Sequence, residues 1–396
     1  MKKQLITLAT ATAMAAPVAV LADSHDDGMS WFDLYGRAHL SLDFEGYDND
    51  AGDAGSLQVH DRRSRLGIQG ENELDNGVTA FYQYEIQMNL DSFEDLQNLL
   101  ENGDAMRDTF VGLRSDELGQ LRAGRLGILN SIAYGPGNYF ATQAGDPANI
   151  LATATPLPAR YGFVQDDPLD YQDPNDQGGD RPDGDSSIAV EYETPAFGPV
   201  SARAILMPSH VDVDGDQEHN WMVMVDYSDG PLSLQGTVAE WYTVGVEDDE
   251  ANPNTPDLVP DGDLDDSSMV FAIQGNYDLG GMNVGGGALT VSADEDDSDN
   301  SAVWFGGNMP VTDRGTAKAQ LSHLSGDRSD SDASIFAVGY DFALAERTTL
   351  YGVASFVNND DEQGIVPHSY ASTAPSTGIG ADESGTVVSG GIIHNF

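Results

Sequence analysis

The sequence predicts an all-β fold, a 16-stranded antiparallel transmembrane β-barrel. Three observations support this prediction. Apolar and polar residues alternate in segments of about ten residues, the connections alternate between short turns and long acidic loops, and no long apolar run follows the first 22 residues. Strands of this length and pattern, with short turns at one end and long loops at the other, are typical of outer-membrane barrels.

The first 22 residues have the pattern of an export signal. Lys2 and Lys3 precede an uncharged stretch that runs from Leu5 to Leu21, and Ala22 comes just before the acidic Asp23. A positive start, an apolar middle and a small residue at the end are typical of a cleaved signal peptide. We therefore expect a signal peptide over 1–22 and a barrel domain over 23–396. A transmembrane helix is the alternative, but the stretch is short and rich in Ala and Thr.

The rest of the chain has no apolar run of about 18 residues, so it offers no second membrane-spanning helix. A chain of this kind that enters a membrane must pair its backbone groups between strands and close its sheet. A soluble β-sandwich would also alternate, but its long connections need not fall at one end.

The alternation is clearest at the start of the mature chain. Apolar residues occupy even positions, whereas polar residues occupy most odd positions: Phe32, Leu34, Ala38, Leu40, Leu42 and Phe44 against Asp33, Arg37, His39, Ser41 and Asp43. Two more strands follow on either side of the turn Asp75-Asn76-Gly77, at about 65–71 and 78–88. The pattern predicts further strands at about 106–114, 120–126, 187–194, 200–206, 221–228, 232–244, 268–278, 282–293, 301–309, 316–324, 333–343, 348–358 and 384–396.

Composition narrows the function. The chain has 17 basic and 66 acidic residues and a net charge of −49, which becomes −51 once Lys2 and Lys3 leave with the signal. Nucleic acid is excluded as a partner by this charge. The absence of cysteine excludes disulfides and thiolate metal sites. We interpret the acidity as adaptation to concentrated salt, because a chain with 15 Tyr and 14 Phe does not have the composition of a disordered protein.

Several segments resemble the trimeric Gram-negative porins. The opening strand 31–37, the segment 64–71, the segment 107–113, the hairpin 336–351 and the terminal segment 389–396 are each similar to the family, in the family's order. The resemblance implies an outer-membrane homotrimer, surrounded by lipid and lipopolysaccharide, that passes ions and small hydrophilic solutes. The resemblance implies no cofactor. The terminal Phe396 is similar to the signal that the barrel-insertion machinery reads, and it is also a candidate interface aromatic.

The resemblance also implies a pore constriction. In the family the third extracellular loop bends inward, and acids on that loop face basic residues on the wall. The one long segment without periodicity, about 126–160, corresponds to this loop. The matching constriction residues are Arg37, Arg65, Arg107 and Arg160, with Asp146 as the one acid between Leu126 and Gln165. Of the 15 basic residues of the mature chain, eight lie between Arg37 and Arg125, but Arg62, Arg114 and Arg122 are more simply explained by pairing with neighbouring acids.

This nearly neutral loop departs from the family, so the sequence predicts two opposed fields. Acidic outer loops should gather cations at the mouth, and the wall arginines should attract anions at the constriction. In the second long connection, 93–100 has apolar residues at helical spacing and is predicted to form a short helix that contacts a neighbouring subunit.

Other functions were weighed. Asp212, Asp214 and Asp216, and likewise Asp261, Asp263 and Asp265, alternate as in calcium loops, but neither run is completed by the expected Gly and Glu. The histidines show no metal-ligand spacing, and no nucleophile stands beside a base, which argues against an enzyme. A plugged structural barrel or adhesin, and a substrate-specific channel, remain alternatives.

Overall fold

A computed structural model describes residues 32–48, 54–91, 106–128, 130–155, 187–208, 219–243, 246–248, 258–260, 266–293, 299–327, 329–361, 363–367 and 384–396. The first half of the barrel contains β1 (Asp33–Asp48), β2 (Ala54–Asp61), β3 (Arg65–Glu73), β4 (Thr79–Gln87), β5 (Met106–Ser115), β6 (Gly119–Leu126), β7 (Ser187–Glu193), β8 (Val200–Met207), β9 (Asn220–Asp229) and β10 (Leu232–Thr243). The second half contains β13 (Asp266–Asp278), β14 (Asn283–Ala293), β15 (Asn300–Thr312), β16 (Gly315–Gly326), β17 (Ala333–Ala345), β18 (Thr348–Asn359) and β19 (Ser384–Asn395).

The remaining elements are short. They are the 3-10 turn η1 (Asp75–Gly77), the helices α2 (Asn130–Ala133) and α3 (Ala148–Ala154), and a separate hairpin of β11 (Val246–Asp248) and β12 (Leu258–Pro260). None of the helices in the described ranges is long and apolar enough to cross a membrane.

The sheet closes on itself. With the exception of β2, each strand of the main sheet pairs antiparallel with the next strand of that sheet along the chain. The first strand, β1, pairs with the last strand, β19, from Arg37 opposite Asn395 to Asp48 opposite Ser384. The main sheet has 17 strands, but β2 and β3 occupy one position in the wall because both pair with β1. The wall therefore has sixteen positions, which confirms the predicted barrel.

The predicted strand ranges agree with the observed ones to within about four residues, and the short hairpin of β11 and β12 and one strand of the wall were not predicted. The alternation did not predict β2, which continues β3 toward the long-loop end after a break at residues 62–64. At that break Arg63 has a φ of 64°, a left-handed conformation that is uncommon for residues other than glycine. The backbone nitrogen of Arg62 still donates to the His39 carbonyl of β1 at 2.9 Å, so the regular ladder is interrupted at Arg63 and Ser64.

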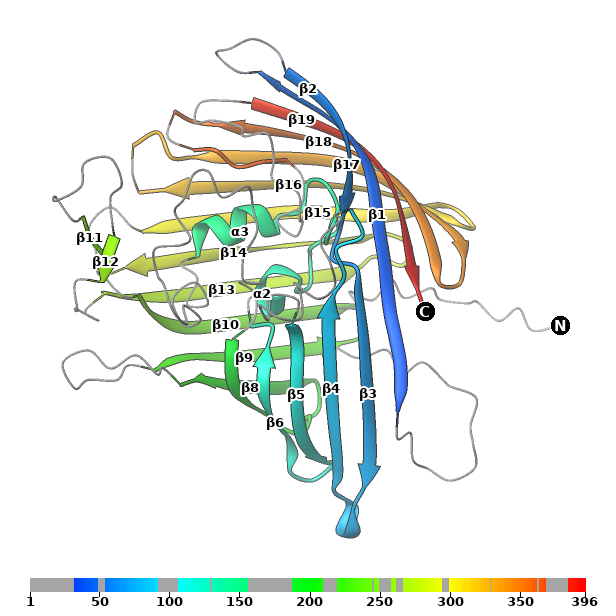
Figure 1. Cartoon of the computed structure of the whole chain (residues 1–396), viewed down its shortest axis with the longest axis vertical. Helices are drawn as coiled ribbons and strands as arrows, with labels where there is room; N and C mark the ends of the chain where they lie inside the picture. The colour runs from blue at the N-terminus through cyan, green and yellow to red at the C-terminus, as the bar shows by residue number, and fades with distance from the viewer. Residues whose placement is uncertain are drawn as a thin grey trace.

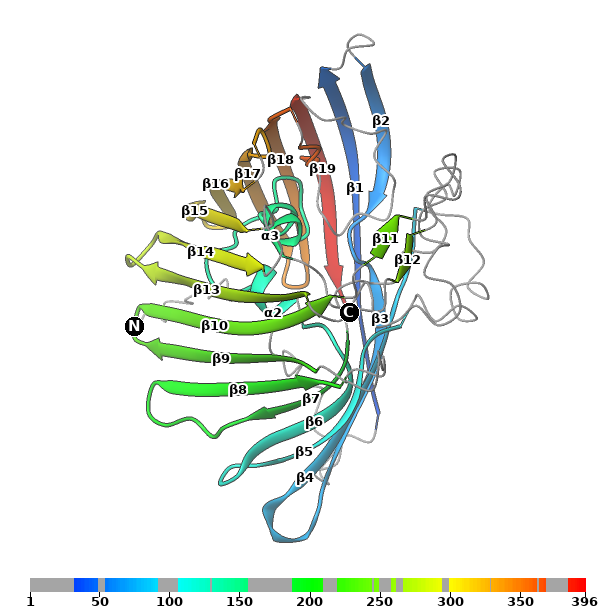
Figure 2. The same cartoon turned by 90° about the vertical axis from the view of Figure 1, so that its left-hand side faces the viewer.

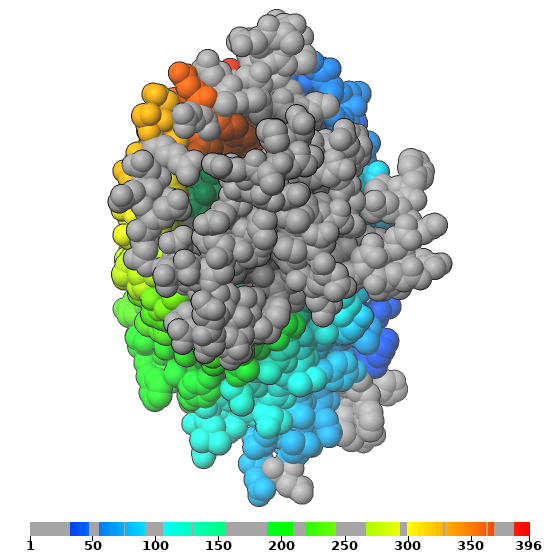
Figure 3. Space-filling model, turned by 60° about the vertical axis from the view of Figure 1, so that its left-hand side comes forward, coloured from blue at the N-terminus to red at the C-terminus, as the bar shows by residue number. Residues whose placement is uncertain are grey.

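The barrel is apolar on the outside. Leu42 and Phe44 are 51% and 58% exposed, whereas His39, Ser41 and Asp43 between and before them are buried. The same inversion holds around the wall, where Val111, Ile273 and Phe305 are all at least 60% exposed. In the space-filling view the strands follow one another as a continuous wall from orange through yellow and green to cyan (Figure 3). A sheet of this kind suits a surrounding of hydrocarbon.

Part of the inner wall is apolar as well, which strict alternation does not predict. Inward side chains of β8 to β18 form one cluster with α2 and α3, and it includes Met222, Trp241, Leu289, Trp304, Leu324, Ile335 and Val357 from the wall and Ile132, Ile150 and Leu151 from the helices. Both helices lie inside the ring of strands (Figures 1 and 2), and α3 contacts β14, β15, β16 and β17. Burial of this apolar surface holds the segment 130–155 against one side of the lumen.

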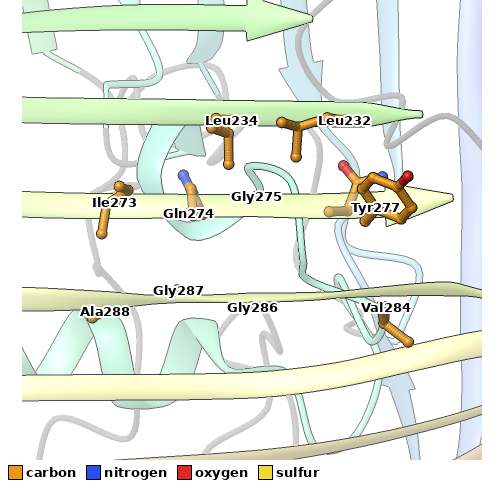
Figure 4. Close-up of a pocket in the computed structure, with 11 residues that line it drawn as sticks. Leu232, Leu234, Ile273, Gln274, Gly275, Tyr277, Val284, Gly286, Gly287 and Ala288 are labelled. Carbon is orange, nitrogen blue, oxygen red and sulfur yellow. The ribbon is translucent and has the colours of Figure 1, made fainter. Parts of the chain in front are cut away.

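Glycines bring this segment close to the wall. A Cβ added to Gly137, whose φ is 96°, would lie 2.5 Å from the amide nitrogen of Gly286 and 2.9 Å from the carbonyl oxygen of Gly275. On the outer face the same two glycines lie in a shallow groove of about 390 Å³ that Leu234 and Ile273 border (Figure 4). The wall of β13 and β14 is thus thin here, and the segment 130–155 lies directly against its backbone.

Candidate functional site: the arginine wall and the inner segment

The charged centre of the inner wall is a cluster of Arg37 on β1, Arg65 on β3, Glu85 on β4 and Arg107 on β5. We call its three arginines the arginine wall. Glu85 accepts from Arg107 Nε at 2.9 Å and from the Tyr35 hydroxyl at 2.9 Å, and its other contact, with Arg65 Nε, is 3.4 Å long. Arg107 also donates to Gln87 Oε1 at 2.9 Å. Arg107 is almost fully buried, whereas 18% of the Arg65 side chain stays exposed. Arg65 is therefore the more accessible of the two guanidinium groups.

Arg37 joins the wall to the inner segment. Its Nη2 donates to Thr142 Oγ1 at 3.0 Å and to Nδ1 of His39 at 3.1 Å. Because arginine has no acceptor, His39 carries its proton on Nε2, which donates to the Tyr351 hydroxyl at 2.9 Å. The hydrogen bond between Arg37 and Thr142 thus joins β1 directly to the segment 130–155.

Polar side chains of the opposite wall hold the segment from behind. Gln320 on β16 accepts from the backbone nitrogen of Tyr139 at 2.9 Å and donates to the Gly137 carbonyl at 3.0 Å. Lys318 donates to Gln143 at 2.6 Å and to Asp341 at 2.8 Å, and it lies 4.8 Å from the Phe140 ring centre. Its charge is thus neutralised behind the segment.

A short stretch after β18 contacts the segment from another side. The backbone nitrogen of Gly145 donates to the Pro367 carbonyl, and Asn149 Nδ2 donates to the Val366 carbonyl, both at 2.8 Å. Ile365 is buried in the same apolar cluster as α3. The Asn359 side chain donates to the Ile365 carbonyl and accepts from the Ile365 backbone nitrogen. The segment is therefore held between the wall and residues 363–367.

Asp146 lies within the segment and is fully buried. Its carboxylate accepts from the backbone nitrogens of Thr142 at 2.6 Å and Ala148 at 2.9 Å, and from Asn138 Nδ2 at 2.9 Å. Burial raises the pKa of Asp146 to about 6, although these hydrogen bonds act in the opposite direction. Thr142, whose φ is 62°, is held in a left-handed conformation by this bonding. The carboxylate is thus directed at the backbone of its own segment.

A sequence model of the family described as Gram-negative porin matches residues 9–362. The chain belongs to the Gram-negative porin family. It is 25% identical to the outer membrane porin protein 32 of Delftia acidovorans over the full length of both chains. It is also 25% identical to the outer membrane porin protein OmpD of Citrobacter koseri, over 61% of this chain and 71% of that protein.

Two further relatives bear on the pore. A monosaccharide porin of a Halomonas species is 21% identical over 92% of this chain and 97% of its own length. An anion-selective porin from Comamonas acidovorans has a similar structure, with a TM-score of 0.66, 21% identity and coverage of 92% of this chain and 99% of that chain. The present protein is accordingly an outer-membrane porin, a channel for the diffusion of solutes.

In this porin the C-terminal residue takes part in barrel closure. The backbone of Phe396 pairs with Gly36 in both directions, at 2.9 and 3.0 Å. Its ring stacks on His394 with centroids 6.2 Å apart, and 43% of the residue is exposed. A Cβ on Gly36 would overlap this ring, so the glycine makes room for it. The structure thus places Phe396 at the seam between the first and last strands.

Arg62, Arg114 and Arg122 pair with neighbouring acids, as expected. Arg62 bonds Asp43, Arg114 bonds Glu71, and Arg122 bonds Glu191 with two hydrogen bonds of 2.8 and 3.0 Å. Arg160, the expected helix at 93–100 and the acidic runs at 212–216 and 261–265 lie outside the described residues.

Sequence reasoning did not single out Glu85, Thr142 or Arg63. Glu85 falls on the polar side of its strand by alternation, but the pairing of β4 with β3 and β5 is needed to place it between two arginines. Arg63 donates to Asn130 at 2.7 Å and lies 5.4 Å from the Tyr134 ring centre. The break between β2 and β3 turns it toward α2, and no pattern in the sequence signals that break.

Proposed function

We propose that ions and small hydrophilic solutes cross this porin passively, through a lumen that the segment 130–155 narrows and that favours anions at its narrowest point. The observation that carries the proposal is the contact of Arg37 with Thr142, beside the cluster of Arg65, Arg107 and Glu85. Ions that pass this side of the segment meet the arginine wall at close range.

The charges of this cluster favour anions. Three guanidinium groups, those of Arg37, Arg65 and Arg107, lie together on this wall with the carboxylate of Glu85, so basic groups outnumber acids within the cluster. The segment offers no balancing acid, because Asp146 is its one acid and is fully buried. Low-dielectric walls focus such a field on the ions in the lumen. A structural relative that is described as anion-selective supports this reading.

The long loops should act in the opposite direction. Their sequences are rich in Asp, as in Asp248, Asp249, Asp261, Asp263, Asp265 and Asp266 of one connection. At about 0.01 M salt the screening length is about 30 Å, so these charges should enrich cations at the mouth, whereas near 1 M it is about 3 Å. Selectivity should therefore shift from cations toward anions as the salt concentration rises.

Reversal potentials across a salt gradient in planar bilayers test the proposal. We expect the native channel to shift toward anions between low and high salt, and Arg65→Ala to lose part of the anion preference at high salt. A cation preference that is equal at both salt concentrations, together with no effect of Arg65→Ala, would mean that the arginines have only a structural role.

Two alternatives have distinct outcomes. A plugged or adhesive barrel would not conduct at all. A channel specific for sugars, which the monosaccharide porin of Halomonas suggests, would conduct ions but would pass hexoses faster than other solutes of equal size in liposome swelling. General diffusion predicts instead that the swelling rate depends on solute size alone.

We also propose the assembly and setting that the family suggests. The protein is exported with residues 1–22 as its signal and forms a homotrimer in outer-membrane lipid and lipopolysaccharide. A structural neighbour, OmpT of Vibrio cholerae, is described in a trimer form, with 15% identity and a TM-score of 0.60. The net charge of −49 supports a habitat of high salt. Cross-linking of the purified protein tests the trimer.

A further inference from the structure

Three potential metal ligands meet on the inner face of β1 and β2. Asp43 and Glu45 are two residues apart on β1, so their side chains lie on the same face. His60 on β2 pairs with Ser41, the next inward position of β1. This register brings the His60 imidazole beside the two carboxylates, although His60 is at least 15 residues away from both of them in the sequence.

The distances suit one shared ion. His60 Nε2 lies 2.9 Å from Glu45 Oε1 and 3.9 Å from Asp43 Oδ2, and the three atoms are all within 4.8 Å of one another. Ligand atoms of a tetrahedral zinc ion at about 2.1 Å lie about 3.4 Å apart, so small rotations of these side chains would place all three around one ion. All three side chains are fully buried.

A second observation concerns Arg62, which is also fully buried. Its Nη2 bonds Asp43 and its Nε donates to Ser41 at 3.0 Å, but its Nη1 has no hydrogen-bond acceptor among the described residues. A buried guanidinium nitrogen of this kind requires an acceptor, and the described residues do not supply one. Water or an anion bound to an ion beside Asp43 is such an acceptor.

The charges of the cluster are consistent with this arrangement. Asp43 and Glu45 against Arg62 leave one negative charge when His60 is neutral. A divalent ion changes the sum to one positive charge, and one anionic ligand, such as hydroxide or chloride, makes it neutral. Buried charges need such compensation.

We propose that Asp43, Glu45 and His60 bind a divalent transition-metal ion of the zinc class, with an exchangeable fourth ligand that Arg62 contacts. An imidazole with two carboxylates suits zinc and its neighbours in the first transition row. Calcium and magnesium require more oxygen ligands than this cluster has. The ion links β1 to β2, and because Ser389 of β19 donates to Asp43 Oδ1 at 2.6 Å, it also strengthens the closing seam of the barrel.

The test is calorimetric titration and thermal unfolding of the purified full-length protein with Zn²⁺, in excess Mg²⁺ to saturate the surface acids. The native protein should bind one Zn²⁺ per chain, and at 100 times the Kd the folding equilibrium should increase about 100-fold. His60→Gln should abolish the binding. His323→Gln is the matched control, because His323 lies 3.8 Å from Asp332 at an exposed site and should not contribute.

A second substitution guards against misfolding. Glu45→Gln keeps the size and the hydrogen-bonding capacity of the side chain, and it should weaken Zn²⁺ binding in a barrel that still conducts. Binding that is equal in the native protein and His60→Gln, or no binding by the native protein beyond the Mg²⁺ background, would overturn the proposal.

Discussion

The substitution Glu85→Gln should make this channel more selective for anions. Glu85 lies between Arg107, at 2.9 Å, and Arg65, at 3.4 Å, and it contributes the one carboxylate of the cluster. Glutamine keeps an acceptor oxygen for the two arginines and for Tyr35 but removes the charge. The net charge of the cluster would therefore become more positive by one.

The size of the effect follows from the Coulomb energy. An ion that passes about 7 Å from the removed charge, in a water-filled lumen, changes in energy by about 0.6 kcal/mol, which is close to RT. Anions would then be enriched about threefold and cations depleted about threefold, so the ratio of anion to cation permeability should rise about sevenfold to tenfold.

The assay is the reversal potential across a chloride salt gradient at about 0.01 M, where the screening length of about 30 Å exceeds the path of about 7 Å. The native channel has the same mouth and is measured under the same conditions as the reference. Glu71→Gln is the matched control. Glu71 pairs with Arg114 on the same wall, where both side chains are more than 40% exposed, and its removal should leave the potential unchanged. An unchanged or reduced anion preference in Glu85→Gln would refute the reasoning.

Three further predictions concern the segment and the seam. Gly137→Ala should lower the free energy of unfolding by about 1–3 kcal/mol, because alanine disfavours a φ of 96° and its Cβ would meet the backbone of β13 and β14. Thermal unfolding should show no such loss for the control Gly236→Ala, because Gly236 has open space around it. The pKa of Asp146 rises from 3.8 to about 6 on folding. Its contribution to stability is therefore fully present below about pH 4 and is lost as the pH rises to about 6. Unfolding midpoints measured across this pH range should show a shallower slope for Asp146→Asn than for the native protein. Phe396→Ser should leave most of the protein outside the heat-resistant barrel fraction, whereas Phe305→Ser, at an outward position that is 65% exposed, should assemble normally; equal yields would mean that Phe396 is one interface aromatic among others.

Period-two alternation predicted most of the barrel because the two faces of each strand have different surroundings. Leu42 and Phe44 face outward and Asp43 faces inward, as their phase indicates. Alternation of apolar and polar residues fails where both faces of a strand meet apolar surroundings. On β18, inward Val353 and Val357 pack against the apolar interior, while outward Phe356 is exposed, and only tertiary packing explains this inner surface.

Local sequence did not predict the break between β2 and β3. Ser56, Gln58 and His60 alternate with Leu57 and Val59, but the run is short, and nothing in it signals the left-handed conformation of Arg63. The contact of Arg63 with Asn130 stabilises that conformation, and this contact forms only when the inner segment is in place.

The constriction was partly predictable. The phases of Arg37 and Arg65 indicated inward side chains, and both lie in the polar network of the inner wall. Their partners were not predictable, because Thr142 and Glu85 reach them through the fold of the segment and the pairing of β3 with β4. Whether these residues line the narrowest point is still a prediction.

The central claim, that ions cross between the arginine wall and the segment 130–155, is tested most directly by modification of a single cysteine. The chain has no cysteine, so Arg65→Cys introduces a unique thiol at a partly exposed position of the inner wall. A bulky thiosulfonate reagent added to one open channel should cause a stepwise loss of current in Arg65→Cys. The native protein and Leu321→Cys, on the outward face, should not respond. Full current through a completely modified Arg65→Cys channel would contradict the account.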